Sequence, residues 1–252
     1  MRWVRVGFAC GVLAAPAPPV AAQQSAPYSA RVEIRRTAYG VPHILARDFG
    51  ALGYGLAWAQ LEDFGFRVVA TLIRARGTLA RYYGRDSLES DLHFRQTHRF
   101  AVEGFDRLDP DTRDLMAGWA AAVNRYVEMY PERVPGWTPR DFTGPDAAAL
   151  WVDETVEPKV RRFLRRLQAR RAGERDRDVG SNAWAFAPGR TTSGRAILLR
   201  NPHLGWEPGW DNRYYEAHIT VPGAVNFYGD FRVGFPLYFN GGFNEHLGWA
   251  TT

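Results

Sequence analysis

The stretch Gly180-Ser181-Asn182-Ala183-Trp184 separates two parts of the sequence that carry different hydrophobic patterns. Upstream, apolar residues recur at spacings of three and four, as on one face of an α-helix. Downstream, residues 182–187 alternate in the manner of a half-buried β-strand. The sequence therefore predicts an α+β protein in which a helical half is followed by a β half, with a charged connector between them.

The expected elements can be located on either side of this junction. One long helix or a pair of helices is expected over 49–83 and another over 110–129, with Asp48 and Asp109 as N-terminal caps. A third helix is expected from Asp146 onward. Alternation and turn residues predict strands over 32–34, 41–44, 182–187, 196–199, 218–221, 225–228 and 237–239, with a hairpin turn at 192–194.

The composition is that of a globular protein. The 252 residues are 46% hydrophobic, 14% aromatic and 23% charged, which provides enough apolar material for a sizeable core. The formal net charge is +5, but Lys159 is the only lysine and the arginines alternate with acidic residues. A nucleic-acid-binding surface gathers basic residues on one face. We therefore expect no nucleic acid among the partners.

The first 22 residues have the three parts of a secretory signal peptide. Arg2 and Arg5 form a charged start, residues 6–15 an apolar run, and residues 20–22 a small-residue cleavage site. Prolines interrupt the run well before the roughly 20 apolar residues that a membrane span needs. We expect a periplasmic or secreted protein without a membrane span. Because Cys10 is the only cysteine, the mature protein has no thiol for catalysis, a disulfide or zinc.

Several familiar motifs are incomplete. The glycines of 50–55 lack the third glycine of a dinucleotide fingerprint, whose place is taken by Trp58. His93 and His98 are five residues apart, which does not place two imidazoles on one helix face as a zinc motif requires. No Gly-x-Ser-x-Gly elbow is present. The junction at Ser181 therefore remains as the candidate for chemistry.

Ser181 becomes a capable nucleophile if the chain is cut between Gly180 and Ser181. A serine hydroxyl needs a nearby base, and a new α-amino group with a reference pKa of about 7.7 to 8.0 lies a few bonds away. The strand expected over 182–187 would hold this terminus. The Arg-rich connector upstream leaves room for the cut. The alternative interpretation is that Gly-Ser-Asn is only a turn before a strand.

Segments on both sides of the junction resemble the penicillin acylase family, and most closely its acyl-homoserine lactone acylase and aculeacin acylase branch. The resemblance covers about residue 32 to the end. The segments that carry it are 39–44, 53–60, 62–63, 74–77, 181–185, 187–191, 198–204, Trp206 and 214–218.

This resemblance implies the αββα sandwich of N-terminal-nucleophile hydrolases, here incomplete. It implies a signal peptide at 1–22, a mostly helical α-chain at 23–158, an Arg-rich spacer at 159–180, and the start of a β-rich β-chain at 181–252. A precursor of this kind cuts itself before the serine, and the two chains remain together as an α/β heterodimer. The β part is shorter than in the family, so we expect a fragment of a larger precursor.

The resemblance also implies roles for individual residues. Ser181 would attack the amide carbonyl of a small-molecule N-acyl substrate, and His203 would support its α-amine. Asn182 is a further candidate for holding the terminus, and no spacing supports a role for the acidic Glu154. No cofactor is required, and structural Ca²⁺ is compatible with the family without assignable ligands. The acyl-binding wall would include Leu204, Phe235 and Trp184, with Trp58 and Trp151 as weaker candidates.

Three functions remain open at this stage. The first is removal of the acyl chain from an acyl-homoserine lactone or a lipopeptide-like compound. The second is a β-lactam acylase with the same fold. The third is an inactive, truncated relative that serves at most as a binding module, because the family's oxyanion-hole donors would lie beyond Thr252. Losing one such donor costs about 100- to 1000-fold in kcat.

Overall fold

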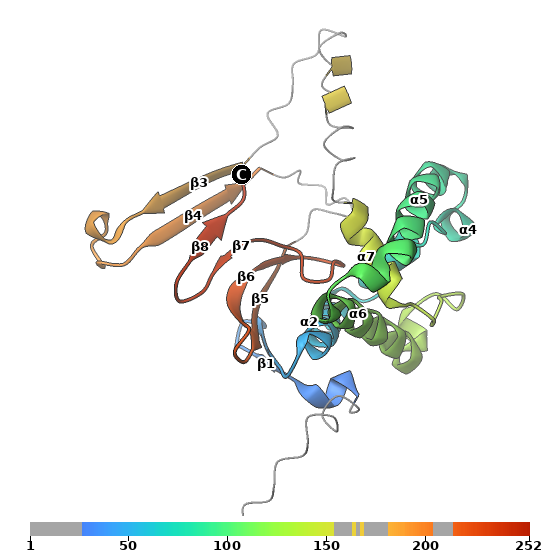
Figure 1. Ribbon diagram of the computed structural model, residues 1–252, viewed down its shortest axis with the longest axis horizontal. Coiled ribbons are helices and arrows are strands. Elements are labelled where there is room, and N and C mark those ends of the chain that lie inside the picture. Colours follow the sequence, from blue (N-terminus) through green and yellow to red (C-terminus); the bar gives the residue numbers. More distant parts are fainter. Residues whose placement is uncertain (1–26, 154–162, 165–166, 169–180, 204–213) are drawn as a thin grey trace, which may run out of the picture.

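The structure is a computed structural model that describes residues 27–153, 163–164, 167–168, 181–203 and 214–252. In these ranges, helices pack against one face of a six-stranded sheet, and a separate two-stranded hairpin extends from the sheet (Figure 1). The α+β class predicted from the sequence is confirmed.

Within the described residues, the helical elements precede Ser181, apart from one short 3₁₀ turn in the hairpin. The α-helices are α2 (Phe49–Phe64), α3 (Phe66–Ala75), α4 (Ala80–Tyr83), α5 (Leu88–Gly104), α6 (Pro110–Met129) and α7 (Gly144–Asp153). Short 3₁₀ turns are η1 (Tyr28–Arg31), η2 (Arg85–Ser87), η3 (Phe105–Arg107), η4 (Pro131–Arg133) and η5 (Pro188–Arg190).

The strands come from both sides of the junction. They are β1 (Val32–Arg36), β2 (Pro42–Ala46), β3 (Ser181–Phe186), β4 (Ile197–Pro202), β5 (Tyr214–Val221), β6 (Val225–Arg232), β7 (Phe239–Phe243) and β8 (Gly248–Ala250). Strands β3 and β4 form the hairpin, and the other six form the main sheet in the order β1-β2-β5-β6-β7-β8. The last strand expected, 237–239, begins two residues later than predicted.

Both predicted helix caps are confirmed. The Asp48 carboxylate accepts the Ala51 N–H at 2.8 Å, and the Asp109 carboxylate accepts the Thr112 N–H at 2.9 Å, so each satisfies a backbone donor that the helix leaves free. The helical stretch over 49–83 is divided into three helices, the first break being at Gly65, whose φ is 53°. Helix α5 was missed because its inward face includes polar residues such as Asp91 and Thr97.

Segments on both sides of the Ser181 junction contribute to the same sheet, a pairing that the sequence pattern does not predict. Strand β2 pairs in parallel with β5, with His43 opposite His218, while the other neighbouring pairs in this sheet are antiparallel. Alternate residues of β2 are buried, and a buried strand needs a partner for its backbone N–H and C=O groups. Ser181 therefore divides the chain but not the sheet.

Helix α2 lies between the sheet and α6 and forms the centre of the core. Its buried residues meet α6 so closely that a Cβ added to Gly118 would lie 1.9 Å from the Gly50 carbonyl oxygen, and one added to Gly53 would lie 2.1 Å from that of Leu115. Glycines thus permit the two backbones to touch. The largest fully buried side chains of this core include Leu52, Leu56, Trp119, Ile44 and Phe231.

Two of the predicted segments lie wholly or mostly outside the described residues. The expected signal peptide at 1–22 lies outside the described residues, as does the spacer at 159–180 apart from residues 163–164 and 167–168. Phe163 and Leu164 are exposed. Among the helices that the structure describes, none is both long and apolar enough to cross a membrane.

Candidate functional site

Ser181 is the first residue of strand β3 and is half-buried. It lies opposite Pro202, the last residue of β4, and Ala183 lies opposite Arg200. Residues opposite each other in an antiparallel pair share a face, and so do residues two apart on a strand. Ser181, Ala183, Arg200 and Pro202 therefore lie on one face of the hairpin, with Ser181 at its open end. This is the strand that the sequence predicted would hold the new terminus.

His203 follows Pro202 directly and is exposed. Its Nε2 lies 3.3 Å from the Asn201 side-chain amide nitrogen, and Asn201 is opposite Asn182. The imidazole is thus brought to the end of the strand that carries Ser181, on the side of the two asparagines. Among the hydrogen bonds of the described residues, none joins the Ser181 hydroxyl to the His203 ring. The supporting role of His203 stays a prediction.

The residues predicted for the autocleavage bond and the acyl-binding wall do not gather at one place in the described structure. Gly180, Leu204 and Glu154 lie outside the described residues. Phe235 is 1% exposed and belongs to the core, with the Arg232 guanidinium 4.2 Å above its ring. Trp184 is 45% exposed on the outer face of the hairpin. The structure does not bring Phe235 and Trp184 together, and their binding roles remain predictions.

An apolar cavity of about 590 Å³ lies between helices α5, α6 and α7 and the segment that joins β6 to β7. The indole N–H of Trp151 donates to the Pro236 carbonyl at 2.7 Å and ties α7 to this segment. Trp58 lies elsewhere, next to Tyr54 and Glu62. The sequence did not predict this cavity, and the role of Trp151 in an acyl-binding wall stays a prediction. The cavity lining includes Phe49, Phe100, Leu108, Leu115, Met116, Trp151, Leu237 and Phe239.

The cavity and the Ser181 hairpin meet opposite faces of the sheet. Phe239 of the cavity pairs with Phe231, which is fully buried against the helices. The hairpin contacts the sheet through Asp230, the neighbour of Phe231 on β6. Because neighbouring residues of a strand alternate between faces, the cavity lies on the helix-covered face and the hairpin on the other.

An ion pair joins the hairpin to the main sheet. The Arg200 guanidinium contacts the Asp230 carboxylate, donates to the Tyr214 hydroxyl at 3.0 Å, and lies 4.7 Å from the centre of that ring. Both charged side chains are largely buried, at 15% and 20% exposure. Sequence reasoning missed this contact, since a pairing between residues 30 positions apart leaves no local signal.

Several contacts join the segment before the junction to the segment after it. The Gln60 side-chain oxygen accepts the Gly234 N–H at 2.7 Å, and the Thr71 hydroxyl donates to the Gly234 carbonyl at 2.9 Å. The Tyr215 hydroxyl donates to Asp63 at 2.7 Å; burial, and then this bond, raise the pKa of Tyr215 well above its ordinary value. Cleavage before Ser181 would leave these contacts intact.

Two histidines also meet across the junction, on strands β2 and β5. Their Nδ1 atoms are 2.9 Å apart, and Nε2 of His218 lies 2.8 Å from the Asn226 side-chain oxygen. An amide oxygen can only accept, so Nε2 of His218 carries a hydrogen and, in the neutral ring, Nδ1 accepts from His43. Nearby on β6, a hydrogen bond to Glu216 raises the pKa of Tyr228 to about 12.

Metal ligation finds no support in the part of the chain that the structure describes, where no three His, Cys, Asp or Glu side chains gather in a metal-binding arrangement. The buried carboxylate of Asp146 has protein partners instead. It contacts the Arg76 guanidinium, the His98 ring at 2.9 Å and the Thr143 N–H at 2.7 Å, and so holds the start of α7 against α3 and α5.

Comparison with known proteins identifies relatives over nearly the whole chain. Acyl-homoserine lactone acylase PvdQ of Pseudomonas putida is 33% identical, with 98% of this chain and 35% of the relative aligned. Aculeacin-A acylase of Actinoplanes utahensis is 26% identical over 100% of this chain and 37% of its own. Penicillin acylase 2 proenzyme of a Pseudomonas species is 24% identical, with 85% of this chain and 37% of the relative aligned. The chain thus spans about a third of the length of these relatives.

A solved structure and a family model add to these matches. The thermostable penicillin G acylase from Alcaligenes faecalis is 28% identical, with a TM-score of 0.44 over 50% of this chain and 73% of that one. The penicillin amidase family model matches residues 31–252. The chain therefore belongs to the penicillin amidase family. The relatives named above are acylases, which are amide hydrolases.

Proposed function

We propose that the protein containing this chain is an exported hydrolase that removes the acyl chain from an N-acyl compound such as an acyl-homoserine lactone or a lipopeptide. The nucleophile is Ser181, exposed by cleavage after Gly180. The observation that carries the proposal is the position of Ser181 as the first residue of a hydrogen-bonded strand. A strand fixes the direction of a new terminus, as a residue that combines nucleophile and base requires.

The proposed reaction uses the new α-amino group as the base. It takes the proton of the Ser181 hydroxyl while the oxygen attacks the amide carbonyl, and it passes the proton to the departing amine. The acyl group remains on the serine as an ester. Water then attacks this ester, which releases the carboxylic acid and restores the hydroxyl. His203, one residue beyond the partner of Ser181 in the ladder, would support the amine. No cofactor enters these steps.

The pairing of β2 with β5 supports the required two-chain state. After cleavage, the α-chain would keep β1 and β2 and the β-chain would keep β5 to β8, with the ladder between His43 and His218 joining them. The contacts of Gly234 with Gln60 and Thr71 would add buried hydrogen bonds to this interface. An α/β heterodimer can therefore persist without a covalent link.

A β-lactam acylase is the second candidate. It is favoured by the alignment with penicillin acylase 2 proenzyme, whereas the acyl-homoserine lactone acylase aligns at higher identity over more of the chain. Comparing hydrolysis of a long-chain acyl-homoserine lactone with that of penicillin G separates the two. Faster turnover of penicillin G would exclude the first substrate class.

Mass spectrometry of the complete gene product tests the proposed nucleophile. We expect a new N-terminus at Ser181, and neither cleavage nor activity in Ser181→Ala. The matched control is Ser193→Ala, which removes an exposed serine in the turn of the same hairpin and should process and hydrolyse as the unchanged protein does. An uncut chain with undiminished activity would refute the proposal.

A further inference from the structure

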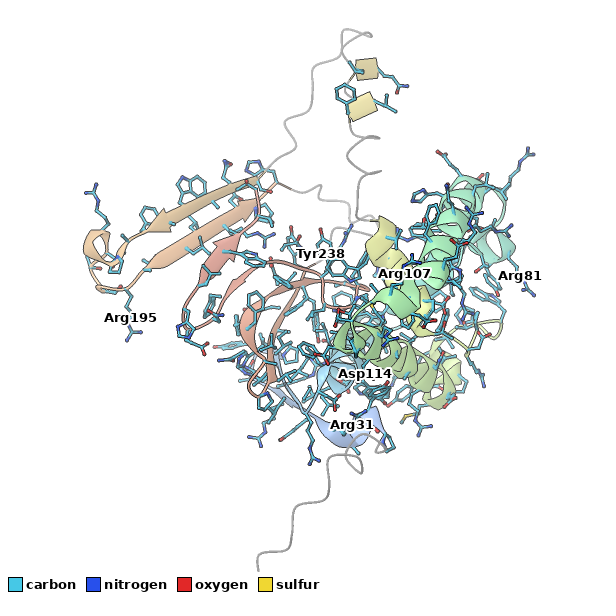
Figure 2. The ribbon with its side chains drawn as sticks, in the orientation of Figure 1. Arg31, Arg81, Arg107, Asp114, Arg195 and Tyr238 are labelled. Carbon is cyan, nitrogen blue, oxygen red and sulfur yellow. The ribbon has the colours of Figure 1, made fainter. Side chains whose placement is uncertain are left out.

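Arg200 lies close to Ser181 along the hairpin and on the same face. Arg200 is opposite Ala183, which is two positions from Ser181 on β3. Measured along the hairpin, Arg200 therefore lies about 7 Å from Ser181. The turn of the hairpin, with the exposed Arg195, lies at the far end (Figure 2). A contact made by Arg200 therefore restrains the end of the hairpin that carries Ser181.

The main sheet provides a shaped and charged place for this side chain. The carboxylate of Asp230 and the hydroxyl and ring of Tyr214 contact its guanidinium. Gly241 leaves room for its stem, since a Cβ on that residue would lie 3.0 Å from Cδ of Arg200. Three neighbouring strands, β5, β6 and β7, thus converge on one arginine.

Because both side chains of the Arg200–Asp230 pair are largely buried, each charge depends on the other for stabilisation. Nε of Arg200 and Oδ1 of Asp230 are buried without a hydrogen-bond partner. Hydrogen bonds therefore offset only part of the cost of removing the two charges from water, and the attraction between the charges has to offset much of the rest. Removing one member of a buried ion pair leaves the other charge uncompensated and is strongly destabilising. Loss of Arg200 would favour separation of the hairpin from the sheet, because water could then reach Asp230.

Apolar contacts alone hold the hairpin less firmly. Leu198 reaches Gly248 of β8, but Trp184, Phe186, Ile197 and Leu199 lie on the other face and are between 43% and 52% exposed. The orientation of β3 relative to the main sheet therefore depends on Arg200 more than on buried apolar area.

We propose that Arg200 is a positioning residue that, through Asp230 and Tyr214, orients the strand carrying Ser181 for self-cleavage and for acyl transfer. This inference rests on the proposed function of Ser181. Arg200 acts through the strand and does not touch the substrate. A displacement of about 1 Å at a nucleophile can lower a rate about 100-fold.

Kinetics of Arg200→Met in the complete gene product test this role. Methionine keeps an unbranched apolar stem and removes the charge. We expect slower appearance of the Ser181 terminus and a kcat about 10- to 100-fold lower per processed molecule, with KM changed by less than about threefold. Arg195→Met, an exposed arginine in the same hairpin, is the matched control and should match the unchanged protein in all three quantities.

Reversal of the pair separates positioning from general loss of stability. Arg200→Asp combined with Asp230→Arg restores opposite charges at the same two positions. Compared with Arg200→Asp alone, we expect the double variant to regain at least a tenth of the difference in kcat between that variant and the unchanged protein. Hydrogen exchange in the uncleaved Ser181→Ala background gives a second measurement. Adding Arg200→Met should raise exchange in β3 and β4 while leaving α2 and α6 protected.

The outcomes distinguish this inference from the proposed function. If the unchanged protein cuts at Ser181 and Arg200→Met keeps its cleavage rate, kcat and hairpin protection, the positioning role is refuted and the nucleophile stands. A loss of protection throughout the protein, without recovery in the reversed pair, would also refute it. If the unchanged protein does not cut at Ser181, both proposals fail.

Discussion

The helical body and the Ser181 hairpin represent two different ways of stabilising structure. In the body, α2 is covered by the sheet on one side and α6 on the other, and residues such as Leu52 and Trp119 are fully buried. Among the described residues, the hairpin is held by its own ladder and contacts the main sheet through Arg200 and Leu198, while Trp184 and Leu199 remain about half exposed. Shape complementarity therefore maintains the body, and one charged contact largely orients the hairpin.

This difference predicts where a small change has a large effect. In an ordinary exposed helix, replacing glycine with alanine stabilises the protein by about 1 kcal/mol. At Gly118 the new methyl group would meet the Gly50 backbone at 1.9 Å, and neither backbone can move without separating α2 from α6. We expect Gly118→Ala to lower the free energy of unfolding by more than about 4 kcal/mol, as measured by urea unfolding.

The matched substitution in the hairpin is Gly189→Ala. A Cβ at Gly189 would find no atom within 4 Å, so the free energy of unfolding should stay within about 0.5 kcal/mol of the original value. Equal effects at Gly118 and Gly189 would contradict the distinction between a tightly packed body and an open hairpin.

A second comparison within the body concerns two carboxylates that share Arg76. Asp146 is 2% exposed and Asp141 is 80% exposed, and each accepts a hydrogen bond from this guanidinium at 2.7 Å. Asp146→Asn leaves the largely buried Arg76 guanidinium with the exposed Asp141 as its remaining carboxylate partner, so we expect a loss of about 3 kcal/mol in the free energy of unfolding. Asp141→Asn should cost less than about 0.5 kcal/mol. Thermal unfolding of both variants checks this, and a similar loss in both would be contrary to it.

Acid should weaken the same contact. Burial alone raises the pKa of Asp146, but the hydrogen bond from His98 and the contacts with Arg76 outweigh it and lower the pKa to about 2, from an ordinary 3.8. A lowered carboxyl pKa favours folding when the group is ionised. Its contribution of about 2 kcal/mol is therefore present above pH 4 and is lost as the pH falls from about 4 to about 2.

Urea unfolding of the original protein and Asp146→Asn as a function of pH tests this linkage. The difference between their free energies of unfolding should shrink by about 1.5 kcal/mol between pH 5 and pH 2.5, because pH 2.5 still lies above the folded-state pKa of about 2. A difference that is constant over this range would show that Asp146 is protonated alike in the folded and unfolded states.

The sequence was informative where the determining interactions are local. Asp48 and Asp109 are three residues from the N–H groups that they accept, and the alternation after Ser181 lies within one hairpin. Helix α5 was not anticipated because Asp91, which caps Leu79 and Ala80, places a polar residue on its buried face. The pairing of β2 with β5 and of Arg200 with Asp230 joins distant segments, and no local pattern encodes which distant segment a strand or a charge will meet.

A small effect is also expected on the outer face of the hairpin. Leu199 lies opposite Trp184, and both are about half exposed, so Leu199→Ala removes a cross-strand contact without opening a cavity. We expect a loss below about 1 kcal/mol in the free energy of unfolding. The same change at Leu72, which is fully buried in α3, should cost about 2 to 5 kcal/mol. If Leu199→Ala proved as costly as Leu72→Ala in urea unfolding, the outer face of the hairpin would have to be packed against another part of the protein, and Arg200 would no longer be its main attachment.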